Sequence, residues 1–154
     1  EITWRDWSSD VCSSDLTTLR THGDAADADT NYAQLYKMAE ECMKNAYAPY
    51  SGYKVGAAIM TADGRVFTGV NVENASYGCT VCAERTACAK AISEGYRDFE
   101  AIAVACNKGK TSMCGICRQF LSEFNPDIEV ITGENPKKLR VKNLSELLPD
   151  VFSM

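Results

Sequence analysis

The sequence predicts an α/β domain of three layers, α/β/α, built on a mixed sheet of about five strands. Two observations carry this expectation. Several short segments are continuously apolar or alternate between apolar and polar residues, which is typical of strands. Other segments repeat apolar residues every three or four positions, which is typical of helices. The chain has 154 residues, enough for one compact domain with a single core, and we expect no second domain.

The first half of the domain is expected to hold one helix and a β-hairpin. Asn31 suits an N-cap, and Pro49 stops the helix because proline has no amide hydrogen. Residues 55–62 are apolar and residues 65–72 alternate, with a turn signal between them at Asp63-Gly64, so two antiparallel strands should follow. The helix prediction rests on apolar residues at helical spacing, which are Tyr32, Leu35, Tyr36, Ala39, Cys42, Met43 and Ala46.

In the second half, helix and strand signals alternate. We expect a helix over 81–94 that Gly95 ends, a strand over 99–106, a helix over 115–124, short strands over 128–132 and 139–141, and a closing helix over 144–148. Asn71 and Glu73 then fall just past the end of a strand, where binding residues commonly lie.

Residues 1–30 are expected to lie outside this domain, which would occupy residues 31–154. The stretch at 6–16 (DWSSDVCSSDL) resembles one reading frame of a short-read sequencing adapter, so we interpret the segment as an assembly artefact foreign to the natural protein. A natural disordered tail is the alternative, because the segment is rich in Asp, Ser and Thr. In either case it is excluded from functional reasoning.

The charge balance argues against a polyanionic partner. Residues 1–30 hold seven acids and two bases, which leaves 14 of the 21 acids and 14 of the 16 bases in the rest of the chain. A neutral domain attracts a nucleic acid weakly. We interpret the basic cluster of Lys137, Lys138, Arg140 and Lys142 as a solvated strand edge.

The apolar segments are too short for a membrane protein. None approaches the ~20 residues that a spanning helix needs, and no charged-then-apolar leader opens the sequence. We therefore expect a cytoplasmic protein without a membrane partner.

The eight cysteines do not suggest a disulfide framework, because several lie within apolar patterns. Four of them are interpreted as small structural residues, namely Cys42, Cys79, Cys88 and Cys106.

The remaining chemistry lies in Cys82-Ala-Glu84 and, about thirty residues later, Cys114-x-x-Cys117. A Cys-x-x-Cys pair alone serves redox dithiols, structural zinc sites or catalytic zinc sites. A third cysteine favours the catalytic zinc arrangement, in which three protein ligands leave the fourth position open for water. The chain's one histidine, His22, lies far away in the sequence, so an all-thiolate site is expected.

Glu84 is the candidate general acid and base. It follows Cys82 by two positions and can place its carboxylate beside the metal-bound water, whose pKa zinc lowers to ~7. The alternative is a structural zinc knuckle or a redox protein, with Glu84 merely solvated on a helix. Cys82, Cys114 and Cys117 all fall at or near predicted helix N-termini, which favour thiolates.

The motifs resemble the small, homotetrameric, zinc-dependent cytidine deaminase family over nearly all of residues 31–154. Two departures are Met113, where the family usually has proline, and Tyr53, where it usually has phenylalanine. The runs that carry the resemblance are 49–58 (PYSGYKVGAA), 71–75 (NVENA), 82–87 (CAERTA), 114–119 (CGICRQ) and 147–152 (LLPDVF).

This resemblance implies hydrolytic deamination of cytidine and deoxycytidine to uridine and deoxyuridine, as in pyrimidine salvage, with Glu84 moving the protons. It implies that Asn71 and Glu73 hold the ribose hydroxyls, that Tyr53 and Ala83 contact the substrate, and that Arg85 and Gln119 support the zinc ligands. Tyr77 and Phe152 would be lent to a neighbour's pocket in a homotetramer with shared active sites. A deaminase of another small aminopyrimidine nucleoside, such as a nucleoside antibiotic, and a non-catalytic zinc or redox protein remain alternatives.

Overall fold

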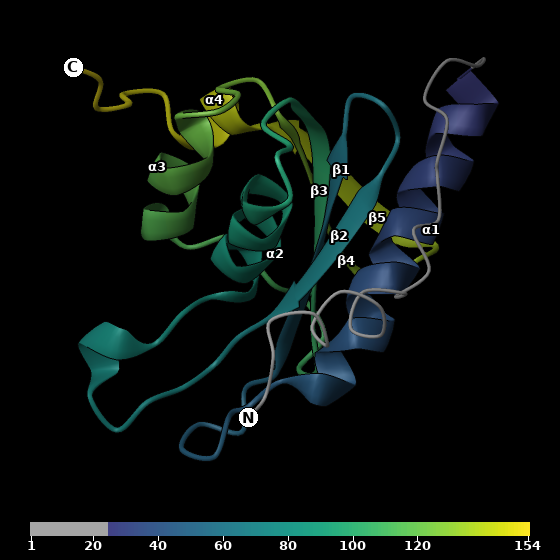
Figure 1. Ribbon diagram of the computed structural model, residues 1–154. Coiled ribbons are helices and arrows are strands. Elements are labelled where there is room, and N and C mark those ends of the chain that lie inside the picture. Colours follow the sequence, from purple (N-terminus) through teal and green to yellow (C-terminus); the bar gives the residue numbers. More distant parts are fainter. Residues whose placement is uncertain (1–24) are drawn as a thin grey trace, which may run out of the picture.

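Five strands form one mixed sheet in the computed structural model, which describes residues 25–154 (Figure 1). The strand order is β2-β1-β3-β4-β5, and all neighbours are antiparallel except β3 and β4, which are parallel. The strands are β1 (Val55–Thr61), β2 (Val66–Val70), β3 (Phe99–Cys106), β4 (Glu129–Asn135) and β5 (Lys138–Asn143).

Helices cover both faces of the sheet, which confirms the predicted three layers (Figure 1). α1 packs on one face through Leu35, Tyr36 and Ala39, while α2 and α3 pack on the other. The strands serve both layers because side chains alternate along them. The helices are α1 (Ala25–Cys42), α2 (Ala83–Ser93), α3 (Gly115–Ser122) and α4 (Leu144–Leu147), with short 3₁₀ helices η1 (Met43–Asn45) and η2 (Tyr77–Cys79).

Gly69 allows α2 to lie directly on the sheet. A Cβ atom at Gly69 would come within 2.3 Å of the Ala87 backbone nitrogen, so no other residue fits without moving the helix. α2 carries Glu84 in its first turn and has Cys82 as its N-cap, so this contact also sets how closely these two residues lie against the sheet.

The first helix differs from its prediction at both ends. α1 begins at Ala25, so Asn31 lies inside the helix and is not its N-cap, and residues 25–30 belong to the helix. Alanines in residues 25–28 have high helix propensity and allow this extension. The α-helix ends at Cys42 and tightens into η1, well before Pro49. Residues 1–24 lie outside the described residues, so the interpretation of that segment stays a prediction.

Most other elements begin and end within three residues of their predicted limits. β3 has the predicted limits, and β1 and β2 form the predicted hairpin. α2 ends before Gly95, whose φ of 94° is incompatible with an α-helix. Cys88 and Cys106 are buried as expected, whereas Cys79 is exposed, because η2 lies in a surface segment between β2 and α2. Within residues 25–154, no helix has the length and apolar character of a membrane span.

Candidate metal and substrate site

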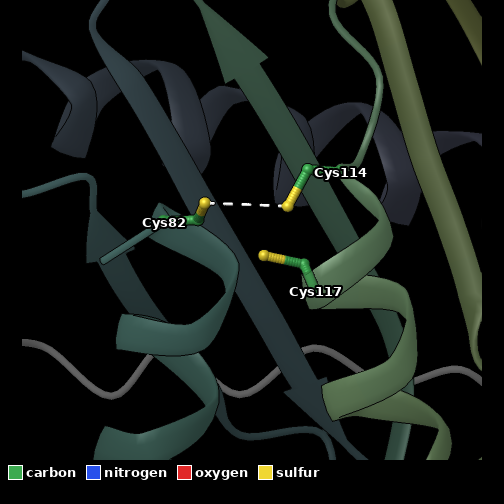
Figure 2. Close-up of side chains that lie close together, drawn as sticks. All are labelled: Cys82, Cys114 and Cys117. Carbon is green, nitrogen blue, oxygen red and sulfur yellow. Dashed lines mark hydrogen bonds between the residues drawn. The ribbon is translucent and has the colours of Figure 1, made fainter. Parts of the chain in front are cut away.

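Three cysteines from two helix N-termini converge at one point (Figure 2). Cys82 is the N-cap of α2, Cys114 is the N-cap of α3, and Cys117 lies in the first turn of α3. Their sulfur atoms all lie within 4.8 Å of one another, and the Cys82 and Cys114 sulfurs are 3.8 Å apart. The cluster that the sequence predicted is therefore assembled by the fold.

The sulfur spacing fits zinc. Tetrahedral zinc with Zn–S bonds of about 2.3 Å places its sulfur ligands about 3.8 Å apart, which matches the Cys82–Cys114 distance of 3.8 Å. Soft thiolate ligands in a tetrahedral arrangement favour zinc over hard cations. Among residues 31–154, whose side chains the structure describes, this is the one group of three or more His, Cys, Asp or Glu that could hold a metal ion, and it supplies three ligands.

Arg85 supplies positive charge beside these sulfurs. Hydrogen bonding with Cys117 lowers the pKa of Cys82 below its usual value, and Arg85 lowers it further. Burial lowers the pKa of Arg85, but the sulfurs of Cys82 and Cys117 raise it by more. Arg85 Nε is buried and has no hydrogen-bond partner among the described residues. That free donor suits a thiolate ligand, which accepts hydrogen bonds more strongly than a thiol does.

Glu84 is a buried carboxyl beside the cysteine cluster. Its side chain is 4% exposed, and burial raises its pKa, with a further increase from the charge of Cys82. A carboxyl group whose pKa is raised above its usual value holds a proton more readily, which suits a group that moves protons. Its position therefore suits acid and base catalysis.

A cavity of about 240 Å³ opens beside Glu84, Cys82 and Cys114. It also brings together four of the predicted substrate-binding residues, Tyr53, Asn71, Glu73 and Ala83. The remaining lining residues are Val55, Thr80, Val81, Thr111 and Ser112.

The side chain of Asn71 is largely engaged with the backbone. Its Oδ1 atom accepts a hydrogen bond from the Val55 amide at 2.8 Å, and its Nδ2 atom donates to the Tyr53 carbonyl at 2.8 Å. One amide hydrogen and one oxygen lone pair remain for a ligand. Asn71 thus braces the segment that carries Tyr53 while lining the cavity.

Glu73 is an ionised acceptor at the edge of the cavity. Hydrogen bonding with the Ser51 hydroxyl lowers its pKa, and the Tyr50 and Ser51 amides, which donate to its Oε2 atom at 2.9 and 3.2 Å, lower it further. A carboxylate held in this way accepts hydrogen bonds from hydroxyl groups.

Tyr77 and Phe152 do not line the metal-side cavity. Tyr77 is 82% exposed and lines an adjoining cavity of about 380 Å³ together with Glu73 and Thr80. The ring of Phe152 is also exposed, while its backbone is held by Gln119, which donates from Nε2 to the Phe152 carbonyl at 2.9 Å and accepts from the Phe152 amide at 3.2 Å. Gln119 was expected to support the metal ligands. That role stays a prediction; in the structure, the side-chain amide of Gln119 holds the C-terminal segment through its two hydrogen bonds with the Phe152 backbone.

Several residues of the site were missed by the sequence reasoning. Thr111 and Ser112 carry no motif, and their place in the cavity wall depends on how the loop between β3 and α3 folds back. Arg118 donates to the Met113 carbonyl at 2.9 Å and to the Leu147 carbonyl at 2.6 Å, which ties this loop to the C-terminal helix. Only its position directly after Cys117 could have drawn attention to it.

Met113 has a structural explanation. Its side chain is 1% exposed and belongs to the core cluster under α2 and α3, so it contributes apolar packing where the resembling family has proline. The Met113 carbonyl accepts a hydrogen bond from Arg118 Nε at 2.9 Å, which holds the loop backbone at this position.

Comparisons with known proteins agree with this geometry. Residues 29–133 match the family described as the cytidine and deoxycytidylate deaminase zinc-binding region. A cytidine deaminase from Halalkalibacterium halodurans is 48% identical over 121 residues, which cover 77% of this chain and 92% of the relative. The crystal structure of a cytidine deaminase from Burkholderia pseudomallei superposes with a TM-score of 0.73 at 48% identity, covering 77% of this chain and 97% of that one.

A more distant relative has a different substrate in its name. It is a blasticidin-S deaminase from Bacillus cereus, 33% identical over 106 residues, which cover 63% of this chain and 75% of the relative. The residues that match the family, 29–133, contain the cysteine cluster and Glu84. The chain belongs to the zinc-binding cytidine and deoxycytidylate deaminase family.

Proposed function

We propose that this protein deaminates cytidine and deoxycytidine by hydrolysis, giving uridine or deoxyuridine and ammonia. The observation that carries the proposal is the buried Glu84 carboxyl, which lines a cavity together with two of the three converging cysteines. A structural zinc knuckle has no need of a buried carboxyl at an open cavity, and a redox dithiol has no need of a third cysteine.

Cys82, Cys114 and Cys117 would hold the zinc ion, which supplies a Lewis acid that lowers the pKa of a water molecule to ~7. Glu84 takes a proton from the attacking water and passes it to the ring nitrogen next to the amine-bearing carbon. The oxygen adds to that carbon, and the carbon–nitrogen bond to the amine then breaks. Glu84 delivers the second proton to the leaving amine, so water and substrate become ammonia and a carbonyl product.

The polar edge of the cavity is suited to a sugar. The Glu73 carboxylate accepts hydrogen bonds, while Asn71 keeps one donor and one acceptor, and together they match hydroxyl groups that both donate and accept. We assign the ribose to this edge and the base to the inner wall, where Tyr53, Ala83 and Glu84 lie.

A second candidate substrate is a nucleoside antibiotic. The relative named blasticidin-S deaminase supports it, because the same cysteines and carboxyl could serve another amine-bearing pyrimidine.

The test follows ultraviolet absorbance and ammonia release with the purified zinc-loaded protein. Cytidine, deoxycytidine and blasticidin S are supplied separately at equal concentration. We expect rapid turnover of the first two and little of the third. Turnover of blasticidin S alone would show that the antibiotic, and not cytidine, is the substrate. Zinc binding without ammonia release from any of the three compounds would refute the proposed enzymatic activity.

We also propose that the protein acts as a homotetramer in which subunits share their sites. The exposed rings of Tyr77 and Phe152 support this, because Tyr77 shares a cavity wall with Glu73 and neither ring lines the metal-side cavity of its own chain. A neighbouring chain that covered the cavity would exclude water and strengthen the electrostatic effects at the zinc.

A further inference from the structure

Two hydroxyl groups in the cavity wall hydrogen-bond to each other. The Tyr53 hydroxyl lies 2.9 Å from Thr111 Oγ1, and both residues line the cavity. Tyr53 precedes β1, whereas Thr111 lies in the loop between β3 and α3, three residues before Cys114. Thr111 is 8% exposed, so most of the residue is enclosed by its neighbours.

Near its start, this loop is fastened to the segment at 52–54 by Asn107. The backbone amide of Asn107 donates to the Lys54 carbonyl at 3.1 Å. In its side chain, Oδ1 accepts from the Lys54 backbone amide at 3.1 Å, and Nδ2 donates to the Gly52 carbonyl at 2.9 Å. Between Asn107 and Cys114, the Tyr53–Thr111 pair is the one described hydrogen bond that joins the two segments. This pair therefore links the metal-side half of the loop to the segment at 52–54, while Arg118 and the buried Met113 side chain hold the loop on the side of α3.

Tyr53 is itself held firmly enough to serve as an anchor. Its amide donates to Ser51 Oγ at 2.9 Å, and its carbonyl accepts from Asn71 Nδ2 at 2.8 Å. The Lys108 ammonium lies 5.9 Å from the centre of its ring, which adds a cation–π contact from the same loop.

We propose that the Tyr53–Thr111 hydrogen bond positions the loop that carries Cys114, and that both are positioning residues for the zinc site and the cavity beside it. Phenylalanine at position 53, the residue usual in the resembling family, would lack this link. The effect on turnover rests on the proposed deaminase function, whereas the effect on zinc retention does not.

A double-mutant cycle tests the pair. It compares the unaltered protein with Tyr53→Phe, Thr111→Val and the double variant, all loaded with zinc. The rate of zinc transfer to a chelator and the kcat and KM for cytidine are measured for each. A neutral hydrogen bond contributes about 0.5–1.5 kcal/mol, so each single change should speed zinc loss and lower kcat about 2- to 10-fold. The double variant should lose no more than the worse single variant, because both changes break one bond.

Tyr36→Phe is the matched control. The Tyr36 hydroxyl donates to the Gly133 carbonyl at 3.0 Å in the core under α1, on the other face of the sheet. Its loss should lower the melting temperature without changing zinc loss or kcat. Zinc loss in the single variants equal to that of the unaltered protein, or losses that multiply in the double variant, would overturn the positioning role. If none of the proteins releases ammonia but zinc loss shows the predicted pattern in the four proteins of the cycle, the proposed function is wrong. The positioning role of the Tyr53–Thr111 pair is then still supported.

Discussion

Asn71 shows how one side chain can serve both the fold and the site. Its two backbone hydrogen bonds tie the end of β2 to the segment before β1, which carries Tyr53. The sequence pattern pointed to Asn71 as a ligand for the sugar, but it could not reveal that half of its hydrogen-bonding capacity is used internally. The residue is therefore expected to tolerate substitution less well than a pure ligand contact.

At Cys114, we predict that replacement by alanine removes zinc binding. Two thiolates bind zinc far more weakly than three, so freshly purified Cys114→Ala should contain little zinc by elemental analysis. Cys79→Ala is the control, because Cys79 is exposed and lies outside the cluster. Equal zinc content in the two variants would contradict the assignment of Cys114.

At Arg85, we predict that methionine weakens zinc binding while preserving the helix. The change keeps a long side chain but removes the positive charge and the buried Nε donor beside Cys82 and Cys117. Loss of such supporting groups typically costs 10- to 100-fold in metal affinity, about 1.4–2.7 kcal/mol. Competition with a zinc chelator measures this, and the exposed Arg97→Met should match the unaltered protein.

Among the elements, the contact between α2 and β2 sets the position of the catalytic carboxyl. We predict that Gly69→Ala destabilises the domain by about 1–3 kcal/mol, the usual cost of overpacking, because its Cβ atom would meet backbone atoms of α2. Thermal unfolding measures the loss. Gly78→Ala is matched to it, since a Cβ atom there meets nothing within 4 Å. Equal melting temperatures for the two variants would show that α2 can shift freely.

The elements also show which parts of a fold can be predicted from one sequence. β3 was predicted at its true limits because its apolar residues, interrupted only at Glu100, are buried on both faces of the sheet. The start of α1 was not, because alanines and acids extend a helix as readily as they form a tail. The metal ligands followed from spacing, whereas Thr111 and Arg118 entered the site through loop geometry that no local pattern encodes.

For the whole molecule, the exposed aromatic rings of Tyr77 and Phe152 predict self-association. We expect light scattering to give a homotetramer, since Tyr77 and Phe152 expose 82% and 72% of their surface in the single chain. Mixing inactive Glu84→Gln chains with Phe152→Ala chains of low activity should restore part of the activity, because some sites then combine an intact carboxyl with an intact ring. A fully active monomer, or no recovery after verified subunit exchange, would refute shared sites.

Glu84→Gln tests the central claim most directly, because it changes one buried carboxyl and leaves the three cysteines in place. Zinc content, melting temperature and cytidine turnover are measured together on this variant and on the unaltered protein, with the exposed Glu94→Gln at the other end of α2 as control. We predict about one zinc per chain and similar melting temperatures in all three proteins. Turnover should fall by at least about 10²- to 10⁴-fold in Glu84→Gln alone. Near-normal turnover in Glu84→Gln with zinc bound would contradict the account.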